Sequence, residues 1–292
     1  MGQQHVTNLP RRYALSYPQY QWLSKLGFTL GMILIGLMMI VPFVWMISAS
    51  VKREADIFVY PIQWLPKIWQ FQNYHDVWFG RAPFGLFYLN SIMVTFWTVL
   101  CQVLTSALAA YAFARINFRG KNVLFLLYLS TMIIPPQVTL VPKFILFNWL
   151  GLLDTHISII LPGAFSAFGV FMLRQFFVAL PFELSESARI DGAGELRIFW
   201  QIIMPLAKPA LASLIILAFV WSWNDYMTPL VFLRSKELYT IPLGLDYFME
   251  DVGTEYSLIM AAAVSAIIPL IMVYFMGQKF FIESIAASGI KG

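Results

Sequence analysis

Six long apolar stretches, separated by more polar connections, dominate the pattern of hydrophobic and polar positions along the chain. A helix needs about 20 predominantly apolar residues to cross roughly 30 Å of hydrocarbon, and each stretch reaches about that length. The stretches are residues 26–49, 86–113, 123–145, 157–177, 206–232 and 258–281. The pattern therefore predicts an all-α, polytopic membrane protein with about six transmembrane helices.

The third and fourth predicted spans contain residues that interrupt helices. Pro135 and Pro136 lie within the third, and Pro162 and Gly163 lie within the fourth. Broken helices persist at membrane depth where neighbouring helices or a water-filled cavity satisfy the freed backbone groups. We therefore expect breaks in both spans.

One transmembrane domain, residues 26–285, covers almost the whole chain. Residues 1–25 form a polar segment before it, and residues 286–292 form a short tail after it. If the N-terminus is cytoplasmic, Lys and Arg are more frequent in the cytoplasmic connections than in the outer ones. The positive-inside rule therefore predicts that both terminal segments are cytoplasmic. No small-residue cleavage site is evident near the first apolar run, so we interpret that run as a retained helix.

The composition excludes a water-soluble domain and a nucleic-acid-binding protein. Hydrophobic residues make up 60% of the chain and charged residues 12%, whereas soluble domains are usually about half apolar and a quarter charged. An aromatic content of 17% suits helices that contact membrane lipid. The net charge of +4 is scattered, so the chain has no basic patch for nucleic acid. The three His residues lie far apart and do not indicate a metal site.

The connection between the fourth and fifth spans, about residues 180–209, is unusually long and polar for a membrane protein. Pro181 is well placed to open a helix. Glu183 and Glu186 follow in its first turns, where acidic side chains complement the helix dipole. Gly192 and Gly194 predict the end of this helix, since Gly readily adopts the left-handed conformation of a C-cap.

A second short helix is predicted to begin at Glu195 and to end at Pro205, just before the fifth span. Its apolar residues at helical spacing are Ile198, Phe199, Ile202 and Ile203. Two short helices joined by a Gly turn would form a surface knob whose exposed apolar side chains need a partner. From the pattern alone, an amphipathic loop that rests on lipid headgroups is an equally good interpretation.

The spacing in this connection resembles the EAA motif of binding-protein-dependent ABC importer permeases. In that family the motif reads Glu-Ala-Ala, three residues, Gly, nine residues, Ile, any residue, Leu-Pro. The matching residues here are Glu186, Ser187, Ala188, Gly192, Ile202, Met204 and Pro205. Ser187 replaces the middle Ala and Met204 replaces Leu, which are small changes in bulk that leave the spacing intact.

The surrounding sequence is similar to the carbohydrate-uptake branch of that family, the relatives of the maltose permeases MalF and MalG. Outside the motif, the strings IIPPQVTLVPKF, ILPGAF and FVWSWNDYMTPLVFL carry this resemblance, which covers about residues 20–285. Six spans and a short first outer loop resemble the MalG type of subunit. The resemblance implies an ABC type I importer permease fold in a bacterial or archaeal cell membrane.

The resemblance also implies that the connection docks into a cleft of a separate ATPase dimer. The implied docking residues are Glu186, Ser187, Ala188, Arg189, Asp191, Gly192, Ala193, Ile202 and Pro205. Further implied partners are a second permease subunit in a heterodimer, an extracytoplasmic solute-binding protein and the carbohydrate substrate. The chain itself lacks the G-x-x-x-x-G-K-[ST] phosphate loop, because Gly120-Lys121 has neither the upstream Gly nor a following Ser or Thr. We therefore expect a non-catalytic subunit without a cofactor, with ATP and Mg on the partner ATPase.

A polar and aromatic group in the fifth span is a candidate substrate path. Trp221, Trp223, Asn224 and Asp225 lie together there, and Asp225 is ionisable. Ionisable residues at membrane depth usually face a cavity or a partner. The aromatic rings would stack on a sugar, and the polar groups would bind its hydroxyls. The alternative for this group is a helix kink or an interhelical hydrogen bond.

Two other classes of transporter stay open from the sequence. A secondary transporter would usually show inverted internal repeats, and none is evident. An ABC permease for peptides, amino acids or another small solute is the second alternative, although ARIDGA and WNDY resemble the sugar branch. The residues do not identify the carbohydrate.

Overall fold

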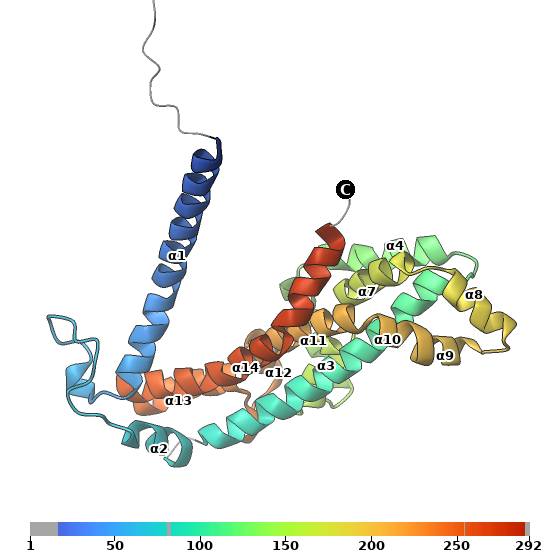
Figure 1. Ribbon diagram of the computed structural model, residues 1–292. Helices are drawn as coiled ribbons and strands as arrows, with labels where there is room; N and C mark the ends of the chain where they lie inside the picture. The colour runs from blue at the N-terminus through green and yellow to red at the C-terminus, as the bar shows by residue number, and fades with distance from the viewer. Residues whose placement is uncertain (1–16, 81–82, 254, 290–292) are drawn as a thin grey trace, which may run out of the picture.

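The computed structural model describes residues 17–80, 83–253 and 255–289, which form helices joined by loops and turns and contain no strand (Figure 1). The α-helices are α1 (Tyr17–Ser50), α2 (Gln72–Phe79), α3 (Phe84–Arg115), α4 (Lys121–Ser130), α5 (Pro136–Trp149), α6 (Ile157–Gly163), α7 (Ala167–Ala179), α8 (Glu183–Ile190), α9 (Glu195–Ile198), α10 (Met204–Leu206), α11 (Lys208–Trp223), α12 (Met227–Phe232), α13 (Ile241–Val252) and α14 (Tyr256–Gly289). Shorter segments are the 3-10 helices η1 (Glu54–Asp56), η2 (Thr131–Ile133) and η4 (Lys236–Leu238), and the π-helix η3 (Phe199–Ile203).

Four helical segments are long and apolar enough to cross a membrane on their own, and counting each of two bent pairs as one span gives up to six. The helices α1, α3 and α14 contain the first, second and sixth predicted spans, and α6 with α7 contains the fourth. The prediction of an all-α, multi-pass membrane protein is therefore confirmed.

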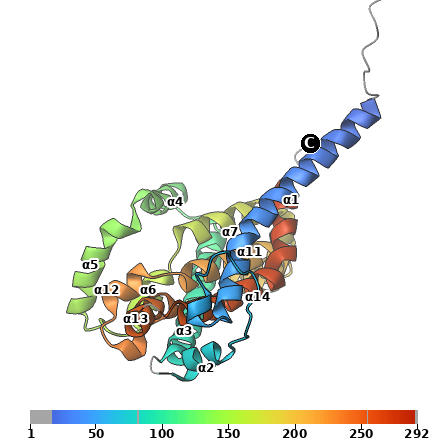
Figure 2. The same ribbon diagram turned by 90° about the vertical axis from the view of Figure 1, so that its left-hand side faces the viewer.

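The predicted breaks in the third and fourth spans are both present. The pair formed by α4 with η2 and α5 is bent by 100° just before Pro136, and Figure 2 shows these helices as an arch beside the bundle. The fourth span breaks between Gly163 and Ala167. The Ser166 hydroxyl accepts a hydrogen bond from the Gly169 N–H at 3.0 Å and so caps the second half.

The fifth predicted span corresponds to α11 and α12. The helical segment from Glu195 to Leu206 meets α11 at an angle of 80°, so the chain turns into this span at Ala207. A second break, over residues 224–226, separates α11 from α12. The break begins at the candidate residues Asn224 and Asp225, which supports the kink that the sequence left open.

The central helix α3 packs against α6, α7, α11 and α13. It approaches α7 closely because small residues face each other, and a Cβ atom on Gly169 would lie 2.6 Å from the Ser106 hydroxyl. Small residues let transmembrane helices pack at short range, which matters where lipid removes the hydrophobic drive between helices. The largest buried cluster joins α3 and α7 to α11 and the connection before it, with Ala107, Leu173, Ile203 and Leu214 fully buried.

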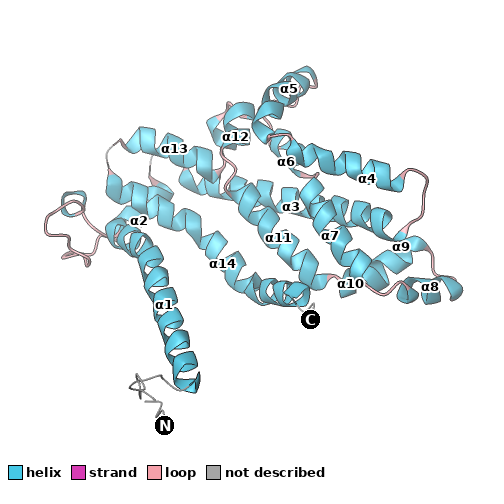
Figure 3. Ribbon diagram, turned by 90° about the horizontal axis from the view of Figure 1, so that it is seen from above, coloured by secondary structure: helices cyan, strands magenta, loops and turns pink. Residues whose placement is uncertain are grey.

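The N-terminal end of α1, the C-terminal end of α14 and the helices α8 to α10 lie on one side of the bundle, whereas α12 and α13 lie on the other (Figure 3). We call the first the docking side and the second the far side. Most of the predicted N-terminal segment (residues 1–16) and the last residues of the predicted tail (290–292) lie outside the described residues.

Candidate functional site

The first candidate site is the docking loop, defined as residues 180–209, in which α8 ends in a Schellman motif. The Ala193 N–H donates to the Ala188 carbonyl at 2.9 Å, and the Gly192 N–H donates to the Arg189 carbonyl at 3.0 Å. Gly192 has φ = +79°, which residues with a side chain rarely adopt. A Cβ atom there would meet no other atom within 4 Å, so glycine is needed for its backbone conformation and not for space. The predicted turn at Gly192 is confirmed.

Gly194, the second glycine of the turn, does not end the first helix as predicted. Gly194 precedes α9 in an extended conformation, with φ = −73° and ψ = 160°, and so begins the second helix. Pro205 does not end that helix, because helical backbone continues to Leu206. The wider turns of η3 come before it, where the Met204 N–H bonds to the Phe199 carbonyl. Pro205 has no backbone N–H to donate. It lies in the first turn of α10, directly after the π-helical turn, where a helix tolerates the missing donor.

The apolar side chains that the docking loop exposes are not the predicted ones. Ile198, Phe199 and Ile203 are fully buried in the core cluster that α3 and α7 share, and Ile202 packs partly against it. The most exposed apolar side chains are Ile190, at 86% exposure, together with Leu196 and Trp200. The helical spacing therefore identified the face of the loop that packs against the rest of this chain. An apolar face that contacts a partner protein would show the same spacing, so the spacing alone does not distinguish the two.

The predicted docking residues divide by exposure. Glu186, Ser187, Asp191, Gly192 and Pro205 are exposed, whereas Ala188, Arg189, Ala193 and Ile202 are half-buried. A hollow of about 240 Å3 separates the two docking helices and is lined by Ala188, Asp191, Ala193, Arg197, Ile198, Gln201 and Ile202. Four of the predicted docking residues, the exposed Asp191 among them, therefore line one concave surface.

A charged pair bridges the two docking helices. The Arg189 Nε donates to the Glu195 Oε1 at 2.8 Å, and its Nη2 lies 3.4 Å from Oε2. The hydrogen bond from Arg189 holds the pKa of Glu195 below its ordinary value, and the same bond raises the pKa of Arg189. From α3, the Tyr111 hydroxyl donates to the Glu195 Oε2 at 2.6 Å. One carboxylate thus joins α8, α9 and α3.

A buried arginine holds the start of the docking loop. Arg115, the last residue of α3, is 3% exposed. Its Nη2 donates to the carbonyls of Phe177 and Leu180 at 2.7 and 2.8 Å, where α7 ends. Its guanidinium lies 5.5 Å from the ring centre of Phe182, and Arg189 lies 5.6 Å from the same ring. The end of α7 therefore has its free carbonyls satisfied by α3.

The second candidate site is an open polar cavity of about 210 Å3 between α3, α5, α6, α11 and α12. Its lining residues are Thr98, Gln102, Lys143, Ile159, Pro162, Gly163, Ala218, Trp221, Ser222, Asp225 and Thr228. Thr98 and Gln102 are more than nine-tenths buried, and the Thr98 hydroxyl has no hydrogen-bond partner within the described part of the chain. Lys143 brings a cation and Asp225 an anion to the same space.

The structure separates the four residues predicted for the substrate path. Trp221 and Asp225 line the polar cavity together. Trp223 is 2% exposed, stacks on Phe219 and donates its Nε1–H to the Ala266 carbonyl at 3.1 Å, so it packs α11 against α14. Asn224 faces a different hollow and donates to the Val220 carbonyl at 2.8 Å.

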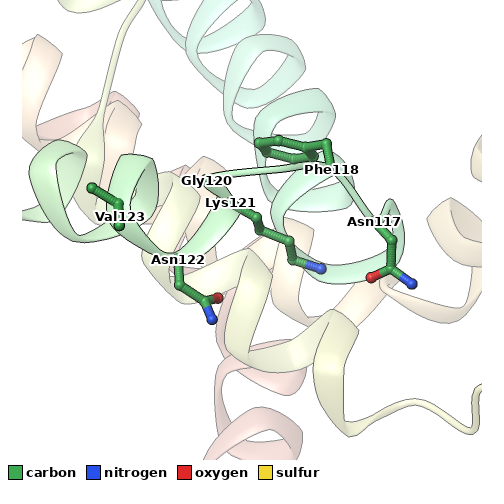
Figure 4. Close-up of a pocket in the computed structure, with 6 residues that line it drawn as sticks. All are labelled: Asn117, Phe118, Gly120, Lys121, Asn122 and Val123. Atoms are coloured by element: carbon green, nitrogen blue, oxygen red, sulfur yellow. The ribbon is translucent and has the colours of Figure 1, made fainter.

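The Gly120-Lys121 pair, which the sequence raised only to dismiss as a phosphate loop, forms a helix-capping turn (Figure 4). Gly120 has φ = +81° and precedes α4. The Lys121 ammonium donates to the Ile116 carbonyl at 3.0 Å, where a cation complements the C-terminal end of α3. The surrounding hollow of about 370 Å3 is lined by this connection and the first turn of α4. The turn therefore joins α3 to α4.

Sequence reasoning missed Tyr111 and Arg115 at the docking loop and Thr98, Gln102 and Lys143 at the cavity. The available signal was polarity inside apolar spans, because buried polar groups in a membrane usually have a partner or face a cavity. Arg115 and Lys143 are charged residues that lie within helices, at the end of α3 and in α5. Their contacts lie far away in the sequence, which no local pattern records.

A multi-pass helical bundle with an open polar cavity between its helices and a two-helix loop has the organisation of a transport permease. The family described as "Binding-protein-dependent transport system inner membrane component" matches residues 102–286, more than half of the chain, and this chain belongs to that family.

Relatives of known function agree over nearly the full length. The chain is 33% identical to the arabinooligosaccharides transport system permease protein AraQ of Bacillus subtilis over 277 residues, 94% of this chain and 98% of that protein. It is 33% identical to the sn-glycerol-3-phosphate transport system permease protein UgpE of Yersinia pestis, covering 88% of this chain and 94% of that protein. A chain in the crystal structure of a bacterial ABC transporter involved in the import of the acidic polysaccharide alginate matches with a TM-score of 0.81 and 28% identity, over 92% of this chain and all of that one.

These similarities confirm two predictions. The chain is a multi-pass membrane permease of the binding-protein-dependent ABC importers, and it resembles the carbohydrate branch of that family.

Proposed function

We propose that this chain is a permease subunit of an ATP-driven, binding-protein-dependent carbohydrate importer and forms half of its translocation path. The observation that carries the proposal is the docking loop, in which EAA spacing coincides with a left-handed turn at Gly192. Around that turn, a hollow and the exposed Ile190, Leu196 and Trp200 offer a surface for another protein. The names of the relatives support a carbohydrate or a similar polar solute as cargo.

In this proposal a separate ATPase dimer binds ATP and Mg and hydrolyses the nucleotide, and the chain itself binds no cofactor. The docking residues Glu186, Ser187, Ala188, Arg189, Asp191, Gly192, Ala193, Ile202 and Pro205 contact that ATPase directly or shape the surface it meets. Nucleotide-dependent movement of the ATPase pair then shifts the permease between outward and inward access, because each state binds a different arrangement of the loop.

The remaining partners are a second permease subunit, which completes a heterodimer, and an extracytoplasmic solute-binding protein that delivers the substrate. The docking side is cytoplasmic in this proposal, which makes both termini cytoplasmic. Support comes from Arg115, Lys121, Arg174 and Arg189, whose side chains all lie near the docking side, as the positive-inside rule requires.

The substrate path in this proposal includes the polar cavity. Trp221 offers a flat apolar face and Asp225 offers acceptors, which are the two features that sugar rings and hydroxyls need. Thr98, Gln102 and Lys143 supply donors on the opposite walls. In the conformation described, Trp223 and Asn224 stay outside the cavity, so we assign them to the path only through their support of its wall.

The test is reconstitution in proteoliposomes with and without the partner proteins. The purified chain alone should neither hydrolyse ATP nor accumulate sugar. The complete complex should hydrolyse ATP faster when the loaded binding protein is added, and sugar should accumulate in the same preparation. Sugar accumulation by the chain alone, driven by an ion gradient, would instead identify a secondary transporter. Stimulation by a loaded amino-acid-binding or peptide-binding protein would replace the carbohydrate by that solute.

A further inference from the structure

Side chains of α3 bind the docking loop, although α3 and the loop are not adjacent in the sequence. The loop joins α7 to α11 in sequence, whereas α3 ends 65 residues before Leu180. Even so, Tyr111 of α3 donates to Glu195 at 2.6 Å, and the Tyr111 ring packs edge-on against Phe199 with ring centres 5.3 Å apart. Arg115 adds its bonds to the carbonyls at the end of α7.

The contact of Tyr111 with Glu195 is strong for its kind. The acceptor is a carboxylate, and hydrogen bonds to ionised groups are shorter and roughly twice as strong as neutral ones. Tyr111 is 4% exposed, so water cannot easily replace its partner. The same carboxylate is held on its other side by Arg189 of α8. The loop therefore meets α3 through a carboxylate that two side chains hold, the buried Tyr111 on one side and Arg189 on the other, although Glu195 itself is exposed.

The helix α3, which contacts the docking loop at Tyr111, also forms part of the wall of the polar cavity. Gln102 and Thr98 lie on α3, roughly 14 and 20 Å along the helix axis from Tyr111 at 1.5 Å per residue. A continuous helix transmits an axial displacement or a rotation over this length, and α3 is unbroken from Phe84 to Arg115.

We propose that Tyr111 is a positioning residue that couples the docking loop to α3, so that a partner which moves the loop also moves the cavity wall formed by Thr98 and Gln102. This inference rests on the proposed docking function and adds a second route to the covalent one through α7 and α11. Removing the Tyr111 hydroxyl should leave the ATPase bound to the permease and should reduce the amount of sugar taken up for each ATP hydrolysed.

The experiment compares wild type, Tyr111→Phe, Glu195→Gln and the double variant in the complete reconstituted complex. Three quantities are measured, namely the ATPase that co-purifies with the permease, the ATP hydrolysed, and the sugar taken up per ATP. Tyr128→Phe is the matched control, because Tyr128 packs beside the same core cluster and its hydroxyl is outside this network.

The expected result is wild-type attachment of the ATPase with sugar uptake per ATP lowered about fivefold in each single variant, the lower end of coupling factors between sites. The double variant should be no worse than Glu195→Gln alone, because Tyr111→Phe removes only the contact with Glu195, whereas Glu195→Gln weakens that contact and the pair with Arg189. Uptake per ATP should not change in the control. Either a normal ratio in Tyr111→Phe or single effects that multiply in the double variant would overturn the inference.

Loss of the attached ATPase in both single variants would also overturn it, since Tyr111 would then only build the docking surface. A wild-type complex that retains no ATPase would refute the docking function itself. The two failures are thus distinguishable in the same set of preparations. Glu195→Gln keeps the size of the side chain, so it serves as a second variant if Tyr111→Phe yields too little protein.

Discussion

Gly192 provides the sharpest test of the docking loop, because its backbone conformation and its surroundings make separate predictions. With φ = +79°, it lies in the left-handed region, where a residue with a side chain costs roughly 1–2 kcal/mol. No atom lies within 4 Å of a Cβ placed there, so the chain's own packing adds no clash. Gly192→Leu should therefore disfavour the docked turn by about 1–2 kcal/mol and weaken ATPase binding roughly 5- to 30-fold.

Gly192→Asn is the matched control, since Asn is close to Leu in size but tolerates the left-handed conformation far better. Binding of the labelled ATPase to the permease complex in nanodiscs gives the dissociation constant for each variant. We expect Leu to weaken binding much more than Asn. Equal losses in both would show that the partner needs the empty space above Gly192 and refute the backbone argument. Unchanged binding of Gly192→Leu would refute the docking assignment.

Three further predictions concern the stability of the fold. Hydrogen bonds from the Ser235 hydroxyl and from the Ser235 and Arg234 backbone lower the pKa of Asp154, so its stabilisation is present above the unfolded pKa of about 3.9 and is lost as pH falls through the lower folded value. The melting temperature of Asp154→Asn in detergent should therefore lie below that of wild type at pH 7 and approach it below about pH 4. Arg115→Met removes the charged donors to the Phe177 and Leu180 carbonyls and should lower the free energy of unfolding by roughly 1–3 kcal/mol, with faster proteolysis of the docking loop. Gly163→Val places a Cβ 2.5 Å from the Thr98 methyl and should lower the free energy of unfolding, measured by thermal unfolding, by roughly 1–3 kcal/mol. Gly27→Val is the control, because a Cβ at Gly27 has no atom within 4 Å.

The parts of the fold that the sequence predicts are those that local physics decides. Hydropathy located the spans because crossing hydrocarbon requires a minimum apolar length, and the bounds of α3 and α14 contain the predicted ones. Pro135 and Pro136 located the bend between α4 and α5, because proline removes a backbone donor from the helix. Gly192 located the turn of the docking loop for the same kind of reason, since one residue type alone adopts its conformation readily.

The parts that the sequence did not predict depend on which side of a helix faces which neighbour. The helix α11 is apolar on all its faces, so the spacing of its apolar residues does not indicate which face each side chain lies on. Trp221 faces the cavity, and Trp223 faces α14. The contact of Tyr111 with Glu195 joins residues 84 positions apart, and neither residue has an unusual neighbour in sequence. Such contacts are set by how the helices pack together.

The attachments of the docking loop also indicate where the cavity should change shape. The loop is continuous with α7 and α11, and Tyr111 and Arg115 fasten α3 to it, so these three neighbouring helices should follow it together (Figure 3). Two of them carry Gln102 and Trp221 of the cavity wall. Lys143 comes from α5, which packs against α12 and joins the rest of the bundle through the 100° bend. A movement that starts at the docking loop therefore should not change the distance between α3 and α11, and it should change the distance from both to Lys143. Since packed helices resist internal deformation, we expect the cavity to open and close at α5.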